Sequence, residues 1–280
     1  MKYKTKRRLV QGCAAIAQNS YIKGYVTGTI YQGKLKLLCV PGLNCYSCPG
    51  ALGSCPMGSL QSAFTSSAVR FPFYVLGLLL LFAVSLGRFI CGWLCPFGFV
   101  QELIDLIPLP KLRVPKLLDR ALRYLKYVVL AVLVIALPLL LRDSFGLSAP
   151  YYCKWLCPAG TLGAGIPLIL TNSSLASAAG GLFLHKLGIL TVILIASAFI
   201  FRPFCKYLCP LGAFYGLFNG ISLTRMTIDK SLCTNCGKCE RVCRMNVEVR
   251  KNINSPECIR CSECLHACPE HAIRHSLKKR

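Results

Sequence analysis

The sequence is poor in acidic residues and in charge of any kind. Of its 280 residues only 10 are Asp or Glu, against 33 Lys and Arg, and charged residues make up 15% of the chain. A soluble domain usually carries about a quarter charged residues, so an ordinary soluble protein is not expected. The hydrophobic content of 54% also excludes a disordered basic chain, which would be poor in apolar residues.

Several cofactor signatures are missing as well. There are only 4 histidines, with no His-rich pair for haem, no glycine motif of a dinucleotide-binding fold and no phosphate-binding loop. Haem, nicotinamide and nucleotide hydrolysis are therefore not expected. No DNA- or RNA-binding module is present, so the basic segment Lys278–Arg280 is predicted to contact anionic lipid rather than nucleic acid.

What the chain does have is 19 cysteines in an apolar sequence of mean hydropathy +0.53. Secreted disulfide scaffolds are usually shorter, and their cysteines do not sit beside long apolar runs. The composition therefore indicates a basic, cysteine-rich integral membrane protein.

Three charge-free apolar stretches are candidate membrane spans: Phe71–Gly87, Tyr127–Leu141 and Leu187–Phe201. They fall a little short of the roughly 20 residues that cross a bilayer. A weaker fourth candidate, Leu9–Tyr31, is diluted by polar residues. Flanking cations can reach the interface and lengthen each span; these are Arg70, Arg88, Lys126, Arg142, Lys186 and Arg202. The sequence thus predicts a mostly α-helical membrane protein with about four transmembrane helices.

The distribution of Lys and Arg predicts the orientation. With four spans, 26 of the 33 cations fall on the side that carries both termini, and that side is expected to be cytoplasmic. The uncharged segment Trp155–Leu184 is rich in small residues, so we expect a half-helix and a loop there. If it crossed the membrane instead, every later side assignment would reverse.

Residues 225–280 differ in composition and form a predicted small α+β domain on the cytoplasmic face, after a membrane domain of residues 1–224. Their eight cysteines have the spacing of a bacterial two-cluster ferredoxin, in which the fourth cysteine of each run binds the other cluster. One [4Fe–4S] cluster is predicted on Cys233, Cys236, Cys239 and Cys268. The other is predicted on Cys258, Cys261, Cys264 and Cys243. A pair of zinc knuckles is the alternative.

Cys-Pro motifs follow the predicted spans. They are Cys45-Tyr-Ser-Cys48-Pro49 with Cys55-Pro56, Cys91-Gly-Trp-Leu-Cys95-Pro96, Cys153-Lys-Trp-Leu-Cys157-Pro158 and Cys205-Lys-Tyr-Leu-Cys209-Pro210. Proline is favoured in the first turn of a helix, because its missing N–H would be unpaired there. Each motif is therefore predicted to open a short, re-entrant or interfacial half-helix. The cysteine just before it would lie where the helix dipole favours a thiolate.

The motifs repeat: Cys45 to Cys153 is 108 residues and Cys95 to Cys209 is 114, which indicates two tandem units. The topology places four cysteines on the inner side, the number that one cubane requires: Cys91, Cys95, Cys205 and Cys209. Five fall on the outer side, one more than a cluster needs: Cys45, Cys48, Cys55, Cys153 and Cys157. Cys39 is a further outer candidate that we expect to be spare, and Cys45 is the next. Outer disulfides remain an alternative if that side is oxidising, and Cys13 is expected to be a small core residue.

With CxxxCP motifs after apolar spans and a C-terminal two-cluster ferredoxin, the chain resembles the NapH and NosR group of membrane iron–sulfur proteins. The segment Cys39-Val-Pro-Gly-Leu-Asn-Cys45-Tyr-Ser-Cys48-Pro-Gly-Ala resembles a prokaryotic branch of that group. The resemblance implies quinol- or ferredoxin-linked electron transfer at a prokaryotic cytoplasmic membrane. It also implies a cytoplasmic ferredoxin or flavoprotein partner, an outer-side reductase and a quinone as a further cofactor. This chain departs from NapH-like proteins in its outer cysteine set.

The sequence therefore favours an electron-transfer protein, a subunit of an oxidoreductase system, with two ferredoxin clusters and one or two membrane clusters in series. Two alternatives stay open. The chain could be a membrane quinone or metal reductase whose outer cysteines act on a substrate. It could also be an anchor that docks a soluble reductase and binds only the ferredoxin clusters. About sixteen irons per chain would fit the first hypothesis, and about eight would fit the anchor.

Overall fold

The computed structural model describes residues 3–65, 72–112 and 114–277. The predicted lipid contact of Lys278–Arg280 and the first residue of the second predicted span, Phe71, lie outside these residues.

Short helices dominate the structure. The first half contains α1 (Tyr3–Gln18), α2 (Ile22–Thr27), η1 (Lys34–Leu37), α3 (Pro56–Thr65), α4 (Phe73–Ser85), α5 (Phe89–Trp93), α6 (Pro96–Ile104), α7 (Lys116–Val128), η2 (Val129–Ala136) and α8 (Leu137–Leu140). The second half contains η3 (Tyr152–Leu156), α9 (Pro158–Gly160), η4 (Thr161–Gly165), α10 (Ile166–Thr171), α11 (Ser173–Ser177), α12 (Gly181–Phe199), α13 (Pro203–Tyr207), α14 (Pro210–Leu217), β1 (Thr224–Ile228), α15 (Lys238–Arg241), α16 (Glu263–Ala267) and β2 (Ile273–Leu277).

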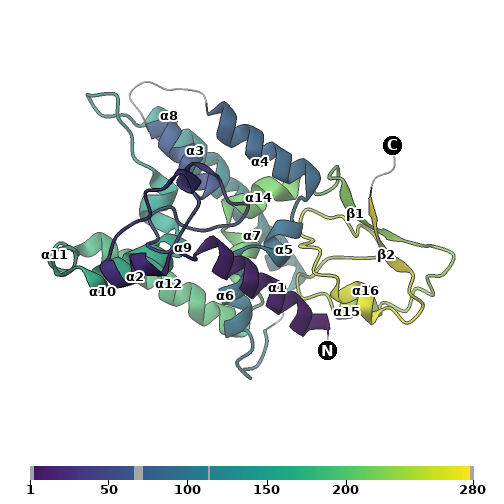
Figure 1. Cartoon of the computed structure of the whole chain (residues 1–280). Helices are drawn as coiled ribbons and strands as arrows, with labels where there is room; N and C mark the ends of the chain where they lie inside the picture. Colours follow the sequence, from purple (N-terminus) through teal and green to yellow (C-terminus); the bar gives the residue numbers. More distant parts are fainter. Residues whose placement is uncertain (1–2, 66–71, 113, 278–280) are drawn as a thin grey trace.

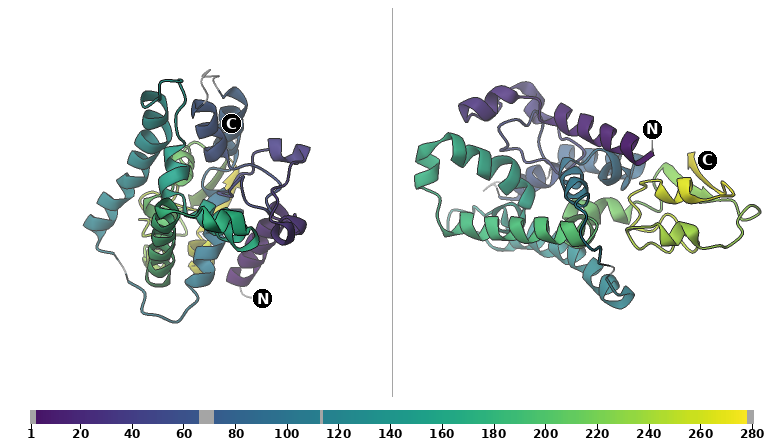
Figure 2. Two further views of the ribbon diagram at one scale, coloured as in Figure 1. Left: turned by 90° about the vertical axis from the view of Figure 1, so that its left-hand side faces the viewer. Right: turned by 90° about the horizontal axis from the view of Figure 1, so that it is seen from below.

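The molecule is elongated (Figure 1). The strands β1 and β2 lie at one end with α15 and α16, and α10 and α11 lie at the opposite end. Seen from below, α12 runs along the length between these ends, and the first residues of α1 lie beside the C-terminal region (Figure 2). Helix α12 packs against α6, α9 and α13, and α14 packs against α4 and α7.

Among the described residues, two helices are long and apolar enough to cross a membrane: Lys116–Leu140, which joins α7, η2 and α8, and Gly181–Phe199. Phe73–Ser85 and Pro158–Thr171 are apolar but shorter. The predicted number of four spans is therefore not confirmed. The segment Trp155–Leu184 breaks after Thr171 and again before Gly181, as a half-helix and loop would.

The weak span candidate Leu9–Tyr31 is not one helix. It divides into α1 and α2, because its polar residues have partners inside the protein. Gln11 Nε2 donates to the Gly92 carbonyl over 2.8 Å, and Gln18 Nε2 donates to that of Leu94 over 2.9 Å. Cys13 is exposed on α1, so the expectation that it is a core residue is wrong.

Four of the five Cys-Pro prolines begin a helix as predicted, whereas Pro49 lies in a turn, so the prediction is wrong for the Cys48 motif. Prolines 96, 158 and 210 are the first residues of α6, α9 and α14, and the preceding cysteines have extended backbone as N-caps. Pro56 likewise begins α3 directly after Cys55. A cysteine that is followed by Pro-x-Gly therefore lies directly before the first turn of a helix.

The C-terminal strands close the cysteine-rich region. β1 pairs antiparallel with β2 from Thr224 opposite Leu277 to Ile228 opposite Ile273, so both ends of the region are joined. Met226 and Ile273 are buried beneath the sheet. The eight cysteines of this region lie between the two strands in sequence.

Candidate functional site

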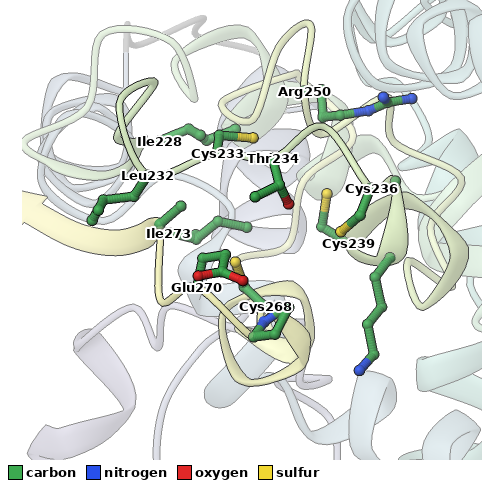
Figure 3. A pocket seen from close by; sticks show the side chains of 14 residues that line it. Ile228, Leu232, Cys233, Thr234, Cys236, Cys239, Arg250, Cys268, Glu270 and Ile273 are labelled. Carbon is green, nitrogen blue, oxygen red and sulfur yellow. The ribbon is translucent and has the colours of Figure 1, made fainter.

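Two pockets in the C-terminal region are each lined by four cysteines. Figure 3 shows the first, where three sulfur atoms of one run and one of the other surround one space: those of Cys233, Cys236, Cys239 and Cys268. The second is lined by Cys243, Cys258, Cys261 and Cys264. These are the sets that the ferredoxin spacing predicts, each with its fourth cysteine taken from the other run.

The backbone of the two cysteine runs adopts matching turns. Each run has three residues with a left-handed backbone at the same offsets from its first cysteine. They are Asn235, Gly237 and Asn246 in the first run, and Arg260, Ser262 and His271 in the second. Such conformations are uncommon outside glycine and cluster at functional sites. Here they turn the chain tightly enough to aim three thiols of one run at one space.

The two pockets differ in exposure. Cys236 is exposed, and the backbone N–H of Lys238 lowers the pKa of its thiol. Burial raises the pKa of the Cys258 thiol and raises that of Cys261 to about 12. The first pocket therefore faces water, and the second faces the helical part of the chain.

Backbone contacts join the second pocket to the Cys91 motif. A Cβ on Gly92 would lie 2.2 Å from the Ile259 carbonyl oxygen, so only glycine allows α5 to approach this loop. Trp93 Nε1 donates to the Arg260 carbonyl over 3.1 Å. The indole therefore ties the Cys91 motif to the cysteine loop.

Four buried cysteines gather where α5 and α6 meet α13 and α14. They are the predicted inner set, Cys91, Cys95, Cys205 and Cys209, and each interacts electrostatically with the others. Gln101 Nε2 donates to Cys205 Sγ over 3.1 Å, and the Gly212 N–H donates to Cys209 Sγ over 3.3 Å. The sulfurs thus stand among donors that would stabilise negative charge.

Two arginines connect the two cysteine motifs of this inner site. Each precedes the first cysteine of its motif by three residues, and each bonds to the other motif. Arg88 Nη2 donates to the Cys205 carbonyl over 3.0 Å, and Arg202 donates to the Cys91 carbonyl. Both side chains are 0% exposed. We expected them to reach the membrane interface from the span ends, and that prediction is wrong: they point into the protein toward the thiols.

Each buried arginine has a carboxylate partner. Arg88 pairs with Glu257 at 3.1 Å, and Arg202 pairs with Glu102 at 2.9 Å. Burial opposes ionisation of Glu257, but the charges of Arg88 and Lys126 outweigh it and hold the pKa of this carboxyl below its usual range. An unpaired buried charge is costly, so these pairs keep the cations inside the protein.

Four outer cysteines surround two glycines at the far end from the strands. A Cβ on Gly160 would lie 3.6 Å from Cys45 Sγ and 3.9 Å from Cys157 Sγ. A Cβ on Gly58 would lie 3.9 Å from Cys153 Sγ, with Cys55 Cβ at 3.8 Å. The same four thiols interact electrostatically with one another: Cys45, Cys55, Cys153 and Cys157. We call these four the outer site.

Cys48 lies close to the outer site but has other hydrogen-bond partners. Its Sγ lies 3.1 Å from the Tyr25 hydroxyl and 3.6 Å from Asn19 Oδ1. Cys39 Sγ lies 3.8 Å from the Ser59 hydroxyl, away from the four thiols. The sequence ranked Cys45 as the next spare cysteine after Cys39, whereas the structure groups Cys45 with Cys157. All 19 cysteines are free thiols, the five outer ones included.

The glycine of each Pro-x-Gly triplet makes room for a site. At the outer site Gly58 and Gly160 face sulfur atoms, as described above. At the inner site a Cβ on Gly98 would lie 2.9 Å from Arg202 Nη1, and one on Gly212 would lie 3.4 Å from Arg88 Nη2. The repeated glycine therefore leaves space for thiols at the outer site and for arginine side chains at the inner site.

Two glutamines beside the cysteines were not predicted from the sequence. Gln61 and Gln101 both lie five residues after a Cys-Pro proline, which is a signal in the sequence. Gln61 Oε1 accepts from the Cys153 N–H over 3.1 Å, and Gln101 Oε1 accepts from the Phe204 N–H over 3.2 Å. Each glutamine thus fixes a cysteine segment of the second tandem unit from a helix of the first.

Two buried tyrosines were also not predicted from the sequence, because they do not recur at matching positions of the Cys-Pro motifs. Tyr152 and Tyr215 are each 0% exposed. Tyr152 interacts electrostatically with Cys157 of the outer site and Cys209 of the inner one. Tyr215 interacts in the same way with inner and outer cysteines, and its hydroxyl donates to the Pro41 carbonyl over 2.9 Å. Two aromatic side chains therefore lie between the two sites.

The donor sets suit clusters better than single ions. Each of the four sites offers four thiols, which is the ligand set of a [4Fe–4S] cluster. Within residues 3–65, 72–112 and 114–277, no three His, Cys, Asp or Glu side chains are arranged to hold one metal ion.

Comparison with known proteins gives the same class. A 4Fe-4S binding domain model matches residues 67–115, 127–169 and 184–228, and a 4Fe-4S dicluster domain model matches residues 225–269. These matches define an iron–sulfur protein of the ferredoxin type. The chain belongs to the NapH-type family of such proteins.

Relatives come from archaea and bacteria. An uncharacterised protein of Methanocaldococcus jannaschii is 30% identical over 236 residues, 81% of this chain and 88% of that protein. The ferredoxin-type protein NapH of Haemophilus influenzae is 27% identical, over 72% of this chain and 66% of its own. The methylamine utilization ferredoxin-type protein MauN of Methylorubrum extorquens is 32% identical, over 67% of this chain and 59% of its own. No solved structure matches the chain.

Proposed function

We propose that the chain is a membrane electron-transfer protein that holds four [4Fe–4S] clusters in series. The observation that carries the proposal is the order of the four thiol sets: the exposed pocket, the second pocket, the inner site and the outer site. When bound, each cluster would accept and release one electron. The proposed ligands are Cys233, Cys236, Cys239 and Cys268; Cys243, Cys258, Cys261 and Cys264; Cys91, Cys95, Cys205 and Cys209; and Cys45, Cys55, Cys153 and Cys157.

The buried cations support the inner cluster. Four thiolates on a cubane leave a net negative charge, which is costly in a dry interior. Arg88 and Arg202 are the two full positive charges on the inner cysteine carbonyls. At the outer site Lys186 Nζ donates to the Cys153 carbonyl over 3.2 Å.

The proposed topology keeps the predicted organisation. A membrane domain of residues 1–224 would cross a prokaryotic cytoplasmic membrane about four times, with both termini and the ferredoxin region of residues 225–280 on the cytoplasmic side. Supporting this, the outer site lies toward the end that is remote from β1 and β2 (Figure 1). The partners would be membrane lipid, a cytoplasmic ferredoxin or flavoprotein and an outer-side reductase.

A quinone reductase is the second candidate, and one cavity favours it. A pocket of about 290 Å³ lies between the end of α12 and the second cysteine pocket. Phe199 and Ile200 give it an apolar wall, and Lys4 and Glu263 give it polar groups. Cys243, a proposed ligand, lies in its lining. A quinone head group there would stand beside the second ferredoxin cluster.

Anaerobic purification with iron and sulfide counting, followed by EPR of the reduced protein, tests the proposal. Four clusters predict about sixteen irons per chain. About eight irons, all in signals that survive replacement of Cys91 and Cys205 by Ala, would instead support an anchor with only the ferredoxin pair. Quinol oxidation by the purified protein would support the second candidate.

A further inference from the structure

A basic groove lies beside the exposed cysteine pocket. It has a volume of about 820 Å³ and runs between the start of α7 and the loop of the first cysteine run. Six cationic side chains line it: Lys116, Arg120, Arg123, Arg241, Arg250 and Lys251. Only two carboxylates, Glu240 and Glu248, line it with them.

The two carboxylates do not neutralise the groove. Glu240 pairs with Arg250 at 3.0 Å, and Glu248 pairs with Lys251 at 3.1 Å. Lys116 and Arg120 are exposed and lie four residues apart on α7, so they share one helix face. Arg123 pairs with Asp119 from the same helix. The groove therefore keeps an excess of three positive charges in the part of the chain that the structure describes.

A proposed cluster ligand opens into this groove. Cys236 is exposed and lies in the groove lining as well as in the first cysteine pocket. Cys236 is the only cysteine of the four thiol sets that is exposed in the described chain. The other exposed cysteine there, Cys13, belongs to none of the sets. A molecule seated in the groove would thus reach the first cluster more closely than any of the other three.

We propose that the groove docks a small acidic one-electron carrier protein, whose carboxylates surround its own redox centre. The inference rests on the proposed function, because it assigns the entry or exit point of the electron path. Charge complementarity carries it: a cationic groove steers an anionic partner and fixes its orientation, which raises the association rate. A permanent interface is expected to have a large apolar core, which such a transient complex does not need.

The test measures electron transfer in stopped flow between the complete cluster-loaded chain and a dithionite-reduced acidic [2Fe–2S] ferredoxin. The protein is held in nanodiscs of a zwitterionic lipid. The variant carries Lys116→Glu and Arg120→Glu. A control variant carries Lys230→Glu and Arg274→Glu, which make the same change of charge at exposed positions outside the groove.

At low ionic strength the groove variant should react about tenfold more slowly than the wild type, and the control within about twofold. The difference should vanish above about 0.5 M salt, because the charges are then screened. A basic c-type cytochrome, used as an acceptor, should react faster with the groove variant than with the wild type.

An equal loss of rate in both variants would overturn the proposal, because the electron-transfer rate would then depend on the net charge of the protein and not on the groove. A wild-type rate that falls to the level of the groove variant once anionic lipid is added would also overturn it, because lipid head groups would occupy the groove. Iron counts separate this failure from that of the proposed function: a groove variant with full iron content and an unchanged rate refutes docking alone, whereas a wild type without membrane clusters refutes both.

Discussion

Replacing Cys45 and Cys48 separately tests the assignment of the outer site. The structure places Cys45 Sγ beside Cys157, whereas Cys48 bonds to Tyr25 and Asn19. Cys45→Ala should therefore remove one ligand of the outer cluster and Cys48→Ala should remove none. Because a cubane holds four irons, iron should fall from about sixteen to about twelve per chain in the first variant and stay near sixteen in the second. Anaerobic iron and sulfide analysis measures this directly.

A thiol from Cys48 could replace a missing ligand, since it is close to the site: its Sγ would lie 3.6 Å from a Cβ on Gly163. The double variant Cys45→Ala with Cys48→Ala excludes this exchange and should hold about twelve irons. Cys39→Ala is the matched control and should hold about sixteen. Loss of four irons from the Cys48 variant, with none lost from the Cys45 variant, would refute the grouping of the four outer thiols.

Three further predictions concern the surroundings of the clusters. Arg88→Gln removes one of the two cations that pair with Glu257 and leaves Lys126; losing a hydrogen bond to a charged group costs about 1.5–3 kcal/mol, so clusters should be lost at a lower temperature in an absorbance melt, and an unchanged melt would contradict the pairing. Gln101→Leu removes the donor to Cys205 Sγ, and a loss of about 1–2 kcal/mol should lower the inner potential by roughly 40–80 mV in an EPR redox titration. Partial desolvation and the charges of Arg260 and His266 lower the pKa of His275 from 6.5, so the unfolded chain binds more protons and stability should fall as the pH drops through 6.5; His275→Phe should weaken this dependence in unfolding scans between about pH 5 and 8.

The cysteines that could be grouped from sequence are those whose partners lie within a few residues. In the C-terminal region the x2 steps fix three thiols on one turn, and the crossed fourth cysteine follows from the doubled motif. The inner four could be grouped because the repeat supplies two thiols from each unit. The pockets and the buried inner cluster of thiols agree with these sets.

The outer ligand set could not be predicted in this way, because a tertiary contact determines which outer cysteines belong to the site. Cys45 and Cys48 are separated by two residues, and only the position of Tyr25 on α2 tells them apart. For the same reason the first span was misjudged: Gln11 and Gln18 find carbonyl partners that no local pattern reveals. Arg88 looked like a span-end cation because hydropathy does not show which way a side chain points.

The crossed arginines explain why the two tandem units depend on each other. Each unit supplies two inner cysteines and one arginine, and each arginine bonds to the carbonyl of the other unit's first cysteine. A single unit would therefore bury a cation without its acceptor and would hold half of a cluster. The carboxylates extend this dependence, since Glu102 lies in the first unit and pairs with Arg202, while Glu257 ties Arg88 to the ferredoxin region. The charges that would compensate the inner cluster are thus the ones that hold the three parts of the chain together, and the cluster and the fold should be lost together.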